Sequence, residues 1–320
     1  MIKNRFYFLL AAVFTLVLTA EGRDFTASCN SETASLDQQP RMVGGGPYIL
    51  YNDDGSVIIH TFDQQMNLHT KTYPNRESTG KITVYSHEGG YEFSFYLHNR
   101  LYTPPARYAE LPEKMLVLSD PHGDIRPFVR TLQGNGVIDE NLNWIFGRGH
   151  LKILGDIQDR GDDQTTILWL VYMLHEQARQ AGGYVHFLIG NHEVIVSQHD
   201  ERYLTPKYLE QAKKIGVRYG DLWLNNSELG RWVNSRNTIQ IMHDRLFVHA
   251  GISPELIETP LTIEQINDTV RKYMVLPRNY PNRTPVATLI MGGTAGPLWY
   301  RSVIQNTLQE SVVDQILARY

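Results

Sequence analysis

The chain has 320 residues, enough for one large domain or for one domain with a small partner. Its formal net charge is −4 and it has no long basic run, which argues against a nucleic-acid-binding surface, because such surfaces normally carry a basic patch or stripe. Cys29 is the single cysteine, so an internal disulfide framework is excluded.

The first residues have the pattern of a secretory signal peptide. Lys3 and Arg5 give a positively charged start, residues 6–18 form an apolar run, and small residues follow. Because the run is short for a bilayer span, we predict a signal peptide over residues 1–22 rather than a membrane anchor. The mature protein is therefore expected in an extracytoplasmic compartment, periplasmic or secreted, without stable membrane insertion.

Two further segments precede the main domain. Residues 23–42 are polar and have no clear period, which indicates a flexible lead-in. Residues 43–105 are predicted to form a small β-rich accessory region. They contain short runs rich in β-branched and aromatic residues, separated by turn signals such as Asp53-Asp54-Gly55. The predicted strands lie at residues 48–51, 57–59, 81–85 and 91–96.

After the accessory region, strands and helices alternate, over residues 106–320. Short apolar segments at residues 114–119, 150–154 and 184–189 indicate buried strands, and residues 125–132 and 163–180 have helical apolar spacing. This order predicts an α/β fold, more specifically a layered α+β core of mixed β-sheets flanked by helices. In such sheets ligands bind at the loops that leave the carboxyl ends of strands.

Four predicted strands end in Asp, Asn or His beside glycine. Each loop alone has an ordinary explanation, since Gly, Asp and Asn are common turn residues. Four such loops in chain order are hard to explain in that way and point to a metal site. The loops are Ser119-Asp120-Pro121-His122-Gly123-Asp124, Gly155-Asp156-Ile157-Gln158-Asp159-Arg160-Gly161, Gly190-Asn191-His192-Glu193 and His249-Ala250-Gly251-Ile252-Ser253-Pro254.

Two residue types in these loops suit phosphate chemistry on two metal ions. A carboxylate such as that of Asp156 can bridge two ions, and the planar guanidinium of Arg160 matches phosphate oxygens. Two ions of this kind can generate a hydroxide and stabilise the attacking and leaving oxygens of an in-line displacement. Mixed carboxylate, imidazole and amide ligands suit manganese, iron or zinc and do not select one of them.

The motifs resemble those of a known enzyme family. The sequences Gly-Asp-x-x-Asp-Arg-Gly at residues 155–161 and Gly-Asn-His-Glu at residues 190–193 resemble the phosphoprotein phosphatase branch of the calcineurin-like metallophosphoesterases. The segment Gly296-Pro297-Leu298-Trp299-Tyr300-Arg301 is similar to the Shewanella-like protein phosphatase subgroup. The resemblance covers roughly residues 115–320. Ser119 stands where Gly is usual and Pro121 is an unusual central residue, but neither change removes a ligand.

The resemblance implies roles for individual residues. Asp120 and His122 would hold one metal, and Asp156 would bridge it to a second. Asn191 and His249 would hold that second metal. The remaining implied roles are general acid for His192, orientation of that acid for Asp159, and phosphate binding for Arg160, Arg301 and Asn191. The implied cofactors are two divalent metal ions, either two manganese ions or iron with zinc.

The implied reaction is phosphomonoester hydrolysis by in-line attack of a metal-bridging hydroxide, without a phosphoenzyme. The expected substrate is a phosphorylated protein carrying phosphotyrosine, phosphoserine or phosphothreonine, and the motifs do not choose among these. A small phosphoester or a dinucleoside polyphosphate is an alternative substrate, since related enzymes share the motifs. An alternative of another class is a phosphate-binding or scaffolding protein whose site has lost activity.

Other conspicuous residues have plainer interpretations. His150, His175, His186 and His243 have no motif around them and are expected to be structural. His199 and Asp200 follow the third motif closely and could at most line the pocket behind the metal ligands. Residues 203–236 are expected to be helical and to shape one wall of the cleft, with their aromatic side chains used for packing. The glycine-rich residues 292–296 lack the features of a phosphate-binding P-loop and are expected to lead flexibly into Trp299 and Arg301.

The last segment lacks one feature of the family. The family normally supplies a further metal-binding histidine beyond the Trp-Tyr-Arg segment, but no histidine follows His249 here. Residues 311–320 have the pattern of an amphipathic helix. We therefore expect a sequence truncated at its C-terminal end, in which the second metal keeps only Asp156, Asn191 and His249. Such a chain is expected to be less active and less stable than a longer form.

Overall fold

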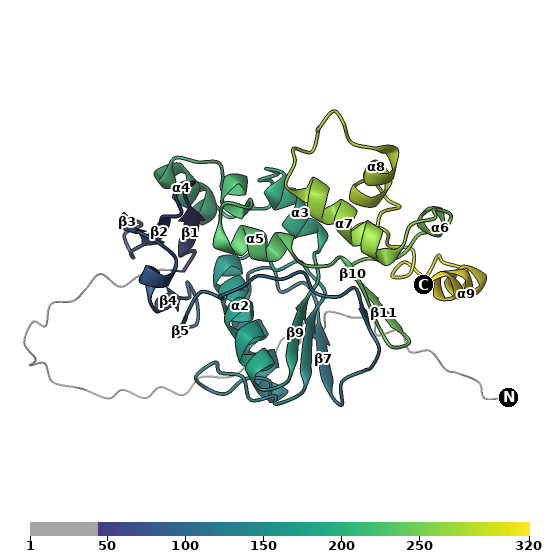
Figure 1. The fold of residues 1–320 in the computed structure, drawn as a ribbon, viewed down its shortest axis with the longest axis horizontal. Helices are drawn as coiled ribbons and strands as arrows, with labels where there is room; N and C mark the ends of the chain where they lie inside the picture. The colour runs from purple at the N-terminus through teal and green to yellow at the C-terminus, as the bar shows by residue number, and fades with distance from the viewer. Residues whose placement is uncertain (1–43) are drawn as a thin grey trace, which may run out of the picture.

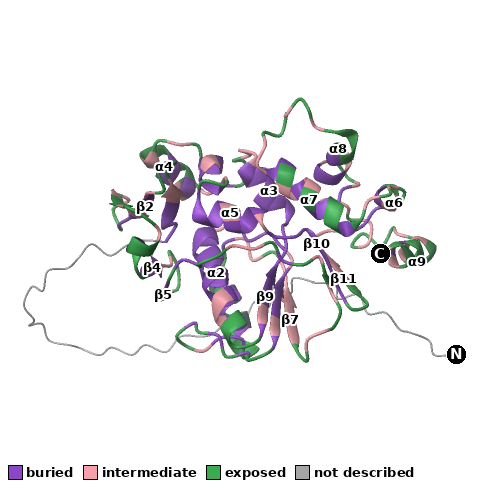
Figure 2. Cartoon of the chain, viewed as in Figure 1, coloured by how far each residue is buried: buried purple, intermediate pink, exposed green. Residues whose placement is uncertain are grey.

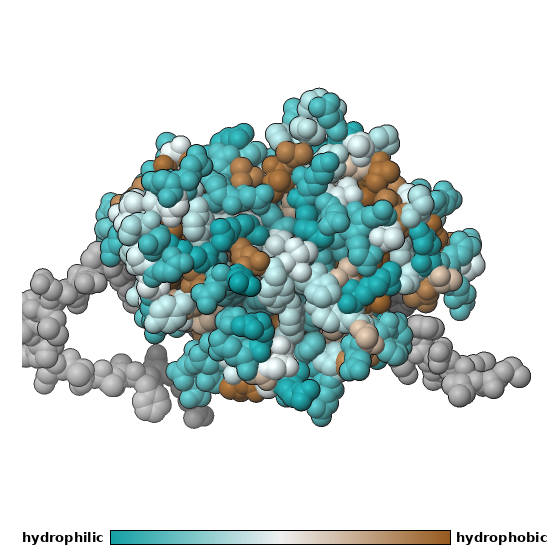
Figure 3. Space-filling model, in the orientation of Figure 1, coloured by the Kyte–Doolittle hydropathy of each residue, from teal (hydrophilic) through white to brown (hydrophobic). Residues whose placement is uncertain are grey.

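The computed structural model of the chain describes residues 44–320, in which helices and sheets pack around one buried core (Figure 1). The predicted signal peptide and lead-in, residues 1–42, lie outside the described residues. Within the described range, no helix combines the length and the apolar character that crossing a bilayer requires. The face seen in Figure 3 is mainly hydrophilic, with apolar side chains in small separate patches.

A three-stranded parallel sheet lies at the centre of the predicted main domain. Its strand order is β7-β8-β9, and helices connect successive strands, as the alternating pattern predicts. The strands are shorter at their carboxyl ends than predicted, so the residues that follow them are free to form loops. The elements are β7 (Met115–Leu118), α1 (Ile125–Gly134), β8 (His150–Ile153), α2 (Gln164–Gln180) and β9 (Tyr184–Phe187).

Helix α2 is the most deeply buried helix of this unit. Its residues from Gln164 to His175 are all buried, because β9 covers one side and the N-terminal strands cover another (Figure 2). Its sequence is accordingly apolar on nearly every side, which is the pattern of a helix inside a core. Only its last turn, which contains Glu176 and Arg179, reaches solvent.

A second sheet continues from the end of β9. Leu188 forms an isolated parallel bridge with Asn237, just before β10 begins. Strands β10 and β11 form an antiparallel hairpin, and β10 pairs in parallel with β6. The sequence pattern did not predict β6, which has only two residues, or β10. The strands are β6 (Arg107–Tyr108), β10 (Ile239–Met242) and β11 (Arg245–Val248).

The N-terminal strands form two small antiparallel sheets. Strands β1 to β3 form one sheet and β4 and β5 form the other. Strand β3 was not predicted because its central residues, His69 to Lys71, are polar and largely exposed. These elements are β1 (Tyr48–Tyr51), β2 (Val57–Phe62), β3 (Leu68–Tyr73), η1 (Glu77–Thr79), β4 (Ile82–Tyr85) and β5 (Glu92–Phe95).

The remaining helices cover the sheets and complete the mixed α/β fold class that the sequence predicts. Residues 203–236 are largely helical, as expected, and α9 matches the predicted C-terminal helix. The helices are α3 (Asn191–Ser197), α4 (Pro206–Ile215), η2 (Tyr219–Trp223), α5 (Glu228–Asn234), α6 (Pro254–Ile257), α7 (Ile263–Met274), α8 (Pro285–Met291) and α9 (Glu310–Arg319).

A buried carboxylate joins the N-terminal strands to the main domain. Glu228, at the start of α5, is fully buried and accepts two hydrogen bonds of 2.9 Å from the guanidinium of Arg76. The hydroxyls of Tyr51 and Tyr172 each donate to the same carboxylate at 2.6 Å. Since Tyr172 belongs to α2, this one carboxylate holds together the N-terminal region, α2 and α5.

Replacing Arg76 with Met should destabilise the protein strongly. The substitution removes both guanidinium hydrogen bonds from the buried carboxylate of Glu228 and leaves it Arg231, at 3.3 Å, as its remaining cation. Breaking a buried ion pair costs about 3–5 kcal/mol. We expect the free energy of unfolding in urea to fall by about 3 kcal/mol, whereas the exposed control Arg130→Met should change it by less than about 0.5 kcal/mol. Equal, small effects of both substitutions would show that the Glu228 network does not anchor the N-terminal strands.

Candidate metal centre

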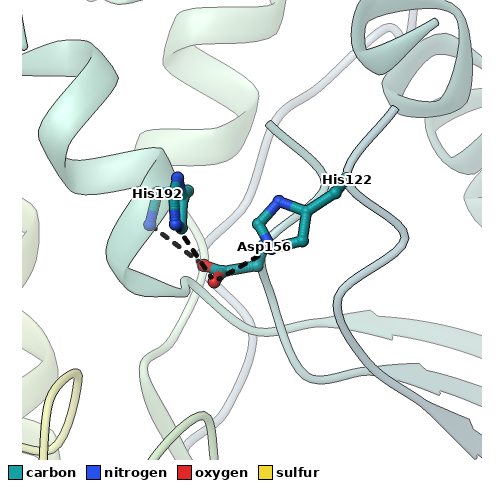
Figure 4. Close-up of side chains that lie close together, drawn as sticks. All are labelled: His122, Asp156 and His192. Atoms are coloured by element: carbon teal, nitrogen blue, oxygen red, sulfur yellow. Dashed lines mark hydrogen bonds and ion pairs between the residues drawn. The ribbon is translucent and has the colours of Figure 1, made fainter. Parts of the chain in front are cut away.

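The four predicted loops meet at one point, at the carboxyl ends of β7, β8, β9 and β11. Asp156 lies at the centre and is buried. Its Oδ2 is 3.8 Å from Nε2 of His122, 3.9 Å from Nε2 of His192 and 3.3 Å from Nε2 of His249. Figure 4 shows the imidazoles of His122 and His192 directed at this carboxylate from two sides. Three imidazoles around one carboxylate form a site of the kind that binds metal ions.

Two of these imidazoles are oriented for metal binding by their second nitrogen. Nδ1 of His122 donates to the backbone oxygen of Gln158 at 2.9 Å, and Nδ1 of His249 donates to that of Leu154 at 2.7 Å. A carbonyl accepts only from a protonated nitrogen, so Nε2 is the nitrogen of each ring that faces the centre and can bind a metal ion in place of a proton. This tautomer and ring orientation fit the metal-binding roles that the family resemblance implies.

Side-chain oxygens of Asp120 and Asn191 join these imidazoles to form two groups of possible metal ligands. Oδ1 of Asp120 lies 3.8 Å from Nε2 of His122, and Oδ1 of Asn191 lies 2.9 Å from Nε2 of His249. Asp120 also forms a compact group of possible ligand atoms with Asp156 and His249. All five predicted metal ligands are therefore brought together, with Asp156 shared between the two groups.

The electrostatics of the centre favour positive charge beside Asp156. Burial alone would raise the pKa of Asp156, but His249 and His192 outweigh it, and the pKa falls to about 2. Burial alone would lower the pKa of His249, but its hydrogen bond to Asp156 and the charge of that carboxylate raise the pKa to about 9. Asp156 therefore keeps its charge and draws a cation toward it, which is what a bridging metal ligand must do.

His192 lies beside this centre and is oriented as predicted for a proton donor. Its Nδ1 donates to Oδ2 of Asp159 at 2.6 Å, and both side chains are buried. Burial raises the pKa of Asp159, and His192 opposes that shift. Nη2 of Arg160 is 3.3 Å from Nε2 of His192. The group predicted to bind phosphate therefore lies next to the group predicted to donate a proton.

The backbone at the site adopts an uncommon conformation. Asp120, His122, Asp156, Asp159 and Arg160 all have φ between 42° and 71°, in the left-handed region that side chains other than glycine rarely occupy. Such residues cost free energy unless the surrounding structure holds them, and they cluster at functional sites. The sequence gives no signal of this strain, because the residues are not glycines.

The close approach of two loops requires glycine at one position. Gly155 has a φ of 94°, and a Cβ at that position would lie 2.5 Å from the backbone nitrogen of Gly190. A side chain there would push apart the loops that carry Asp156 and Asn191. The glycines of the two motifs are thus explained by loop contact, in addition to the tight turns that the sequence indicates.

Glu193 links the same two loops, a role the sequence analysis did not assign. Its carboxylate is fully buried and accepts hydrogen bonds of 2.8 to 3.2 Å from four backbone N–H groups. Burial and the nearby charge of Asp156 raise its pKa to about 7. The four donors are the backbone nitrogens of Gly190, Asp156, Ile157 and Gln158.

Asp163 connects the site to the N-terminal strands, also without a signal in the sequence. It precedes α2 but does not cap it. Its carboxylate accepts from the backbone nitrogens of His87 and Glu88 at 2.6 and 2.8 Å, in the turn between β4 and β5. Its own nitrogen donates to the oxygen of Gly123 in the first loop at 3.0 Å. Asp163 therefore links the N-terminal region to the first loop, from a position just after the second loop.

Arg301 lies at the edge of the centre rather than within it. Its side chain is exposed. The preceding residues run along the fourth loop, where the nitrogens of Ala250 and Gly251 donate to the oxygen of Pro297 at 3.2 and 3.4 Å. This places the segment beside the loop that carries His249. The structure of residues 44–320 shows no direct contact between the side chain of Arg301 and the predicted metal ligands.

The other histidines make their contacts outside the metal centre. Nε2 of His186 lies 3.0 Å from Nδ1 of His150, and His175 accepts from or donates to the hydroxyl of Tyr102 at 2.9 Å. His243 is exposed beside Asp244. His199 faces Asp221 at 3.6 Å, so it does not point into the metal centre.

Comparison with known proteins gives a consistent family relationship. A family model described as calcineurin-like phosphoesterase matches residues 113–314. Shewanella-like protein phosphatase 2 of Arabidopsis thaliana is 26% identical over 207 residues, which is 52% of each chain. Shewanella-like protein phosphatase 1 of Plasmodium berghei is 27% identical over 156 residues, 48% of this chain and 42% of the other. The chain spans about half the length of the curated relatives it matches.

The fold is also similar to that of a solved phosphatase. The cold-active protein-tyrosine phosphatase of a psychrophilic Shewanella species superimposes with a TM-score of 0.76 and 32% sequence identity. The match covers 85% of this chain and 80% of the other. A second structure of a cold-active protein tyrosine phosphatase gives a TM-score of 0.77 at 31% identity, covering 88% of this chain and 80% of the other.

Replacing Glu193 with Gln should loosen the centre without removing a metal ligand. The amide keeps one acceptor oxygen and turns an NH2 group toward N–H donors, and each buried donor left unpaired costs about 1–3 kcal/mol. We expect the free energy of unfolding to fall by about 3 kcal/mol and metal affinity to weaken. Urea unfolding and isothermal titration with Mn²⁺ measure the two effects, with the exposed Glu140→Gln as control. Unchanged stability would contradict the role given to Glu193.

Proposed function

The chain belongs to the calcineurin-like phosphoesterase family, and from this premise we propose that it is a metal-dependent protein phosphatase that hydrolyses phosphomonoesters. One observation carries the proposal. The buried His192–Asp159 pair places a proton-donating nitrogen 3.3 Å from the guanidinium of Arg160 and 3.9 Å from the central carboxylate of Asp156. A phosphate bound at this point meets a cation, a proton donor and the metal ligands at once.

Two divalent metal ions fit the donor groups of the site. Asp120, His122 and Asp156 would hold one ion, and Asp156, Asn191 and His249 would hold the other. When bound, such ions lower the pKa of water and withdraw charge from phosphoryl oxygens. The mixed oxygen and imidazole ligands are compatible with two manganese ions or with iron and zinc. We propose these metals on the chemistry of the ligands and on the family resemblance.

Arg160 has two alternative partners in the proposed reaction. A guanidinium can only donate, so its contact with His192 requires Nε2 of the imidazole to accept. His192 can give a proton from Nε2 only when Arg160 has left it. A bound phosphoryl group supplies that alternative partner, because its oxygens attract guanidinium strongly. Substrate binding therefore frees the atom that must protonate the leaving oxygen, while Asp159 stabilises the protonated ring.

The remaining phosphate contacts come from the edge of the centre. Arg301, on the segment beside the His249 loop, is exposed and free to reach a bound phosphate. Asn191 offers its amide nitrogen to a phosphoryl oxygen while its amide oxygen faces His249. These contacts add charge neutralisation and orientation, which are the main protein contributions to phosphoryl transfer.

Phosphotyrosine in proteins is the substrate that the comparisons support most directly. Solved structures with 31–32% identity are named protein tyrosine phosphatases, and the sequence relatives are named protein phosphatases. A kinetic comparison of a phosphotyrosine peptide, a phosphoserine peptide and a dinucleoside tetraphosphate tests this proposal. A higher kcat/KM for the dinucleotide than for both peptides would replace it with the small-phosphoester alternative.

We further propose that the protein acts outside the cytoplasm, in a periplasmic or secreted form. The support is the charged start and short apolar run of residues 1–18, followed by small residues. N-terminal sequencing of the protein recovered from its native compartment would test the proposed signal cleavage.

Removal of metal should abolish hydrolysis. We expect chelation to reduce the activity against an aryl phosphate to background, because the nucleophilic water loses its activation. Adding back Mn²⁺, or Fe²⁺ with Zn²⁺, should restore the activity, and elemental analysis should show which metals the active protein contains. Full activity in a sample verified to be free of metal would rule out the two-metal proposal.

Replacing His192 with Ala should lower kcat according to the leaving group. General acid catalysis contributes about 10²–10⁴-fold, and a good leaving group needs it less. We expect a loss of about 10³-fold on a phosphoserine peptide and a much smaller loss on p-nitrophenyl phosphate. The exposed His243→Ala is the control and should leave both rates unchanged. Equal losses on the two substrates would mean that His192 acts in some other way.

A further inference from the structure

Tyr203 lies beside the centre and has no part in the metal and phosphate roles described above. Its ring packs edge to face against the ring of His192, with centroids 5.2 Å apart. Its backbone oxygen accepts from the nitrogen of Arg160 at 2.9 Å. Tyr203 is thus attached both to the proton donor and to the motif loop that carries the phosphate-binding guanidinium.

The ring of Tyr203 is exposed, unlike the other aromatic residues that follow α3. The expectation that aromatic residues of this stretch serve for packing is confirmed for Tyr208, Tyr219, Trp223 and Trp232, which are all buried. Tyr203 instead keeps 42% of its surface accessible. Because this exposed side chain lies directly beside His192, it is accessible to a ligand bound at the centre.

The exposed ring is nevertheless held in place. The guanidinium carbon of Arg160 lies 5.9 Å from the ring centroid and that of Arg202 lies 5.4 Å from it. Arg202 is itself fixed by two hydrogen bonds of 2.8 and 2.6 Å to the mostly buried carboxylate of Asp200. A ring flanked by two cations and one imidazole is a preformed surface, so little entropy is lost when a ligand packs on it.

The position of the leaving group follows from the geometry of His192. The oxygen that departs must lie within hydrogen-bond reach of Nε2 of His192, which is also the atom that Arg160 approaches to 3.3 Å. Arg160 and His192 both contact Tyr203. The substituent carried by the departing oxygen therefore extends from a point that borders the Tyr203 ring.

We propose that Tyr203 is a specificity-determining residue that packs against the leaving group and favours aryl over alkyl phosphate esters. The inference rests on the proposed phosphatase function and deepens it. A phenol leaving group presents a second ring, and aromatic pairs at centroid distances of about 4.5–7 Å attract each other beyond the effect of buried area. The single methylene of a phosphoserine side chain offers much less surface. The energies of aromatic pairs correspond to a preference of about 2- to 10-fold.

The first experiment compares two phosphopeptides that differ only in the phosphorylated residue. Values of kcat/KM for the phosphotyrosine and phosphoserine forms are measured for the wild type, Y203F, Y203L and Y203A. We expect Y203F to keep the wild-type ratio, and Y203L and Y203A to lower it by about 2- to 10-fold, mainly by raising KM for phosphotyrosine. The matched control Y96A replaces another exposed tyrosine and should leave the ratio unchanged. An unchanged ratio in Y203L and Y203A overturns the proposal.

The second experiment measures binding without turnover, so that the two proposals can fail separately. Isothermal titration compares phenylphosphonate with methylphosphonate on the metal-loaded wild type and on Y203A. We expect the wild type to prefer phenylphosphonate and Y203A to lose that preference. This result without hydrolysis of any phosphoester would support the role of Tyr203 and refute the phosphatase function. Normal hydrolysis with no phenyl preference in the wild type, or with the preference retained in Y203A, would overturn the role of Tyr203 and leave the phosphatase function intact.

Discussion

The geometry of the centre depends on the hydrogen bonds that the carboxylate of Glu193 accepts from the backbone. This carboxylate gathers backbone N–H groups from the loops after β8 and β9, and it does so inside the protein, where no water can replace it. These bonds fix the turn that presents Asp156 relative to the turn that presents Asn191 and His192. Metal binding and proton donation need these side chains at fixed separations, so one buried carboxylate supports both.

The rest of the site shows why such support is necessary. Asp156 and Asp159 carry their ligand and orienting groups on backbone in the left-handed region, a conformation that local interactions alone do not favour. Close packing at Gly155 and the hydrogen bonds of Glu193 hold it from outside the turn. The strain is thus balanced by tertiary contacts.

The N-terminal strands are part of this support rather than a separate attachment. Glu228 binds Arg76 and Tyr51 of that region to α2 and α5, and Asp163 binds the turn between β4 and β5 to the loops of the site. The hydrophobic core runs through both parts without a break. The N-terminal strands and the metal centre therefore share α2, which begins shortly after the second motif.

The class of fold and a metal-dependent phosphoester chemistry were predictable from motifs along the chain. Strand–helix alternation, together with loops that end in Asp, Asn and His beside glycine, was enough to predict an α/β sheet with ligands at its carboxyl edge, since those patterns are local. It did not identify β6, whose two residues pair with a strand more than a hundred positions away. It also did not identify β10, although the hairpin of β10 with β11 is local. Nor did it distinguish Tyr203 from the buried Tyr208, since exposure depends on what packs against each ring. Only the tertiary structure reveals the contacts of Glu193, Asp163 and Tyr203. These hydrogen bonds and ring contacts join distant loops, and no periodic pattern in the sequence indicates them.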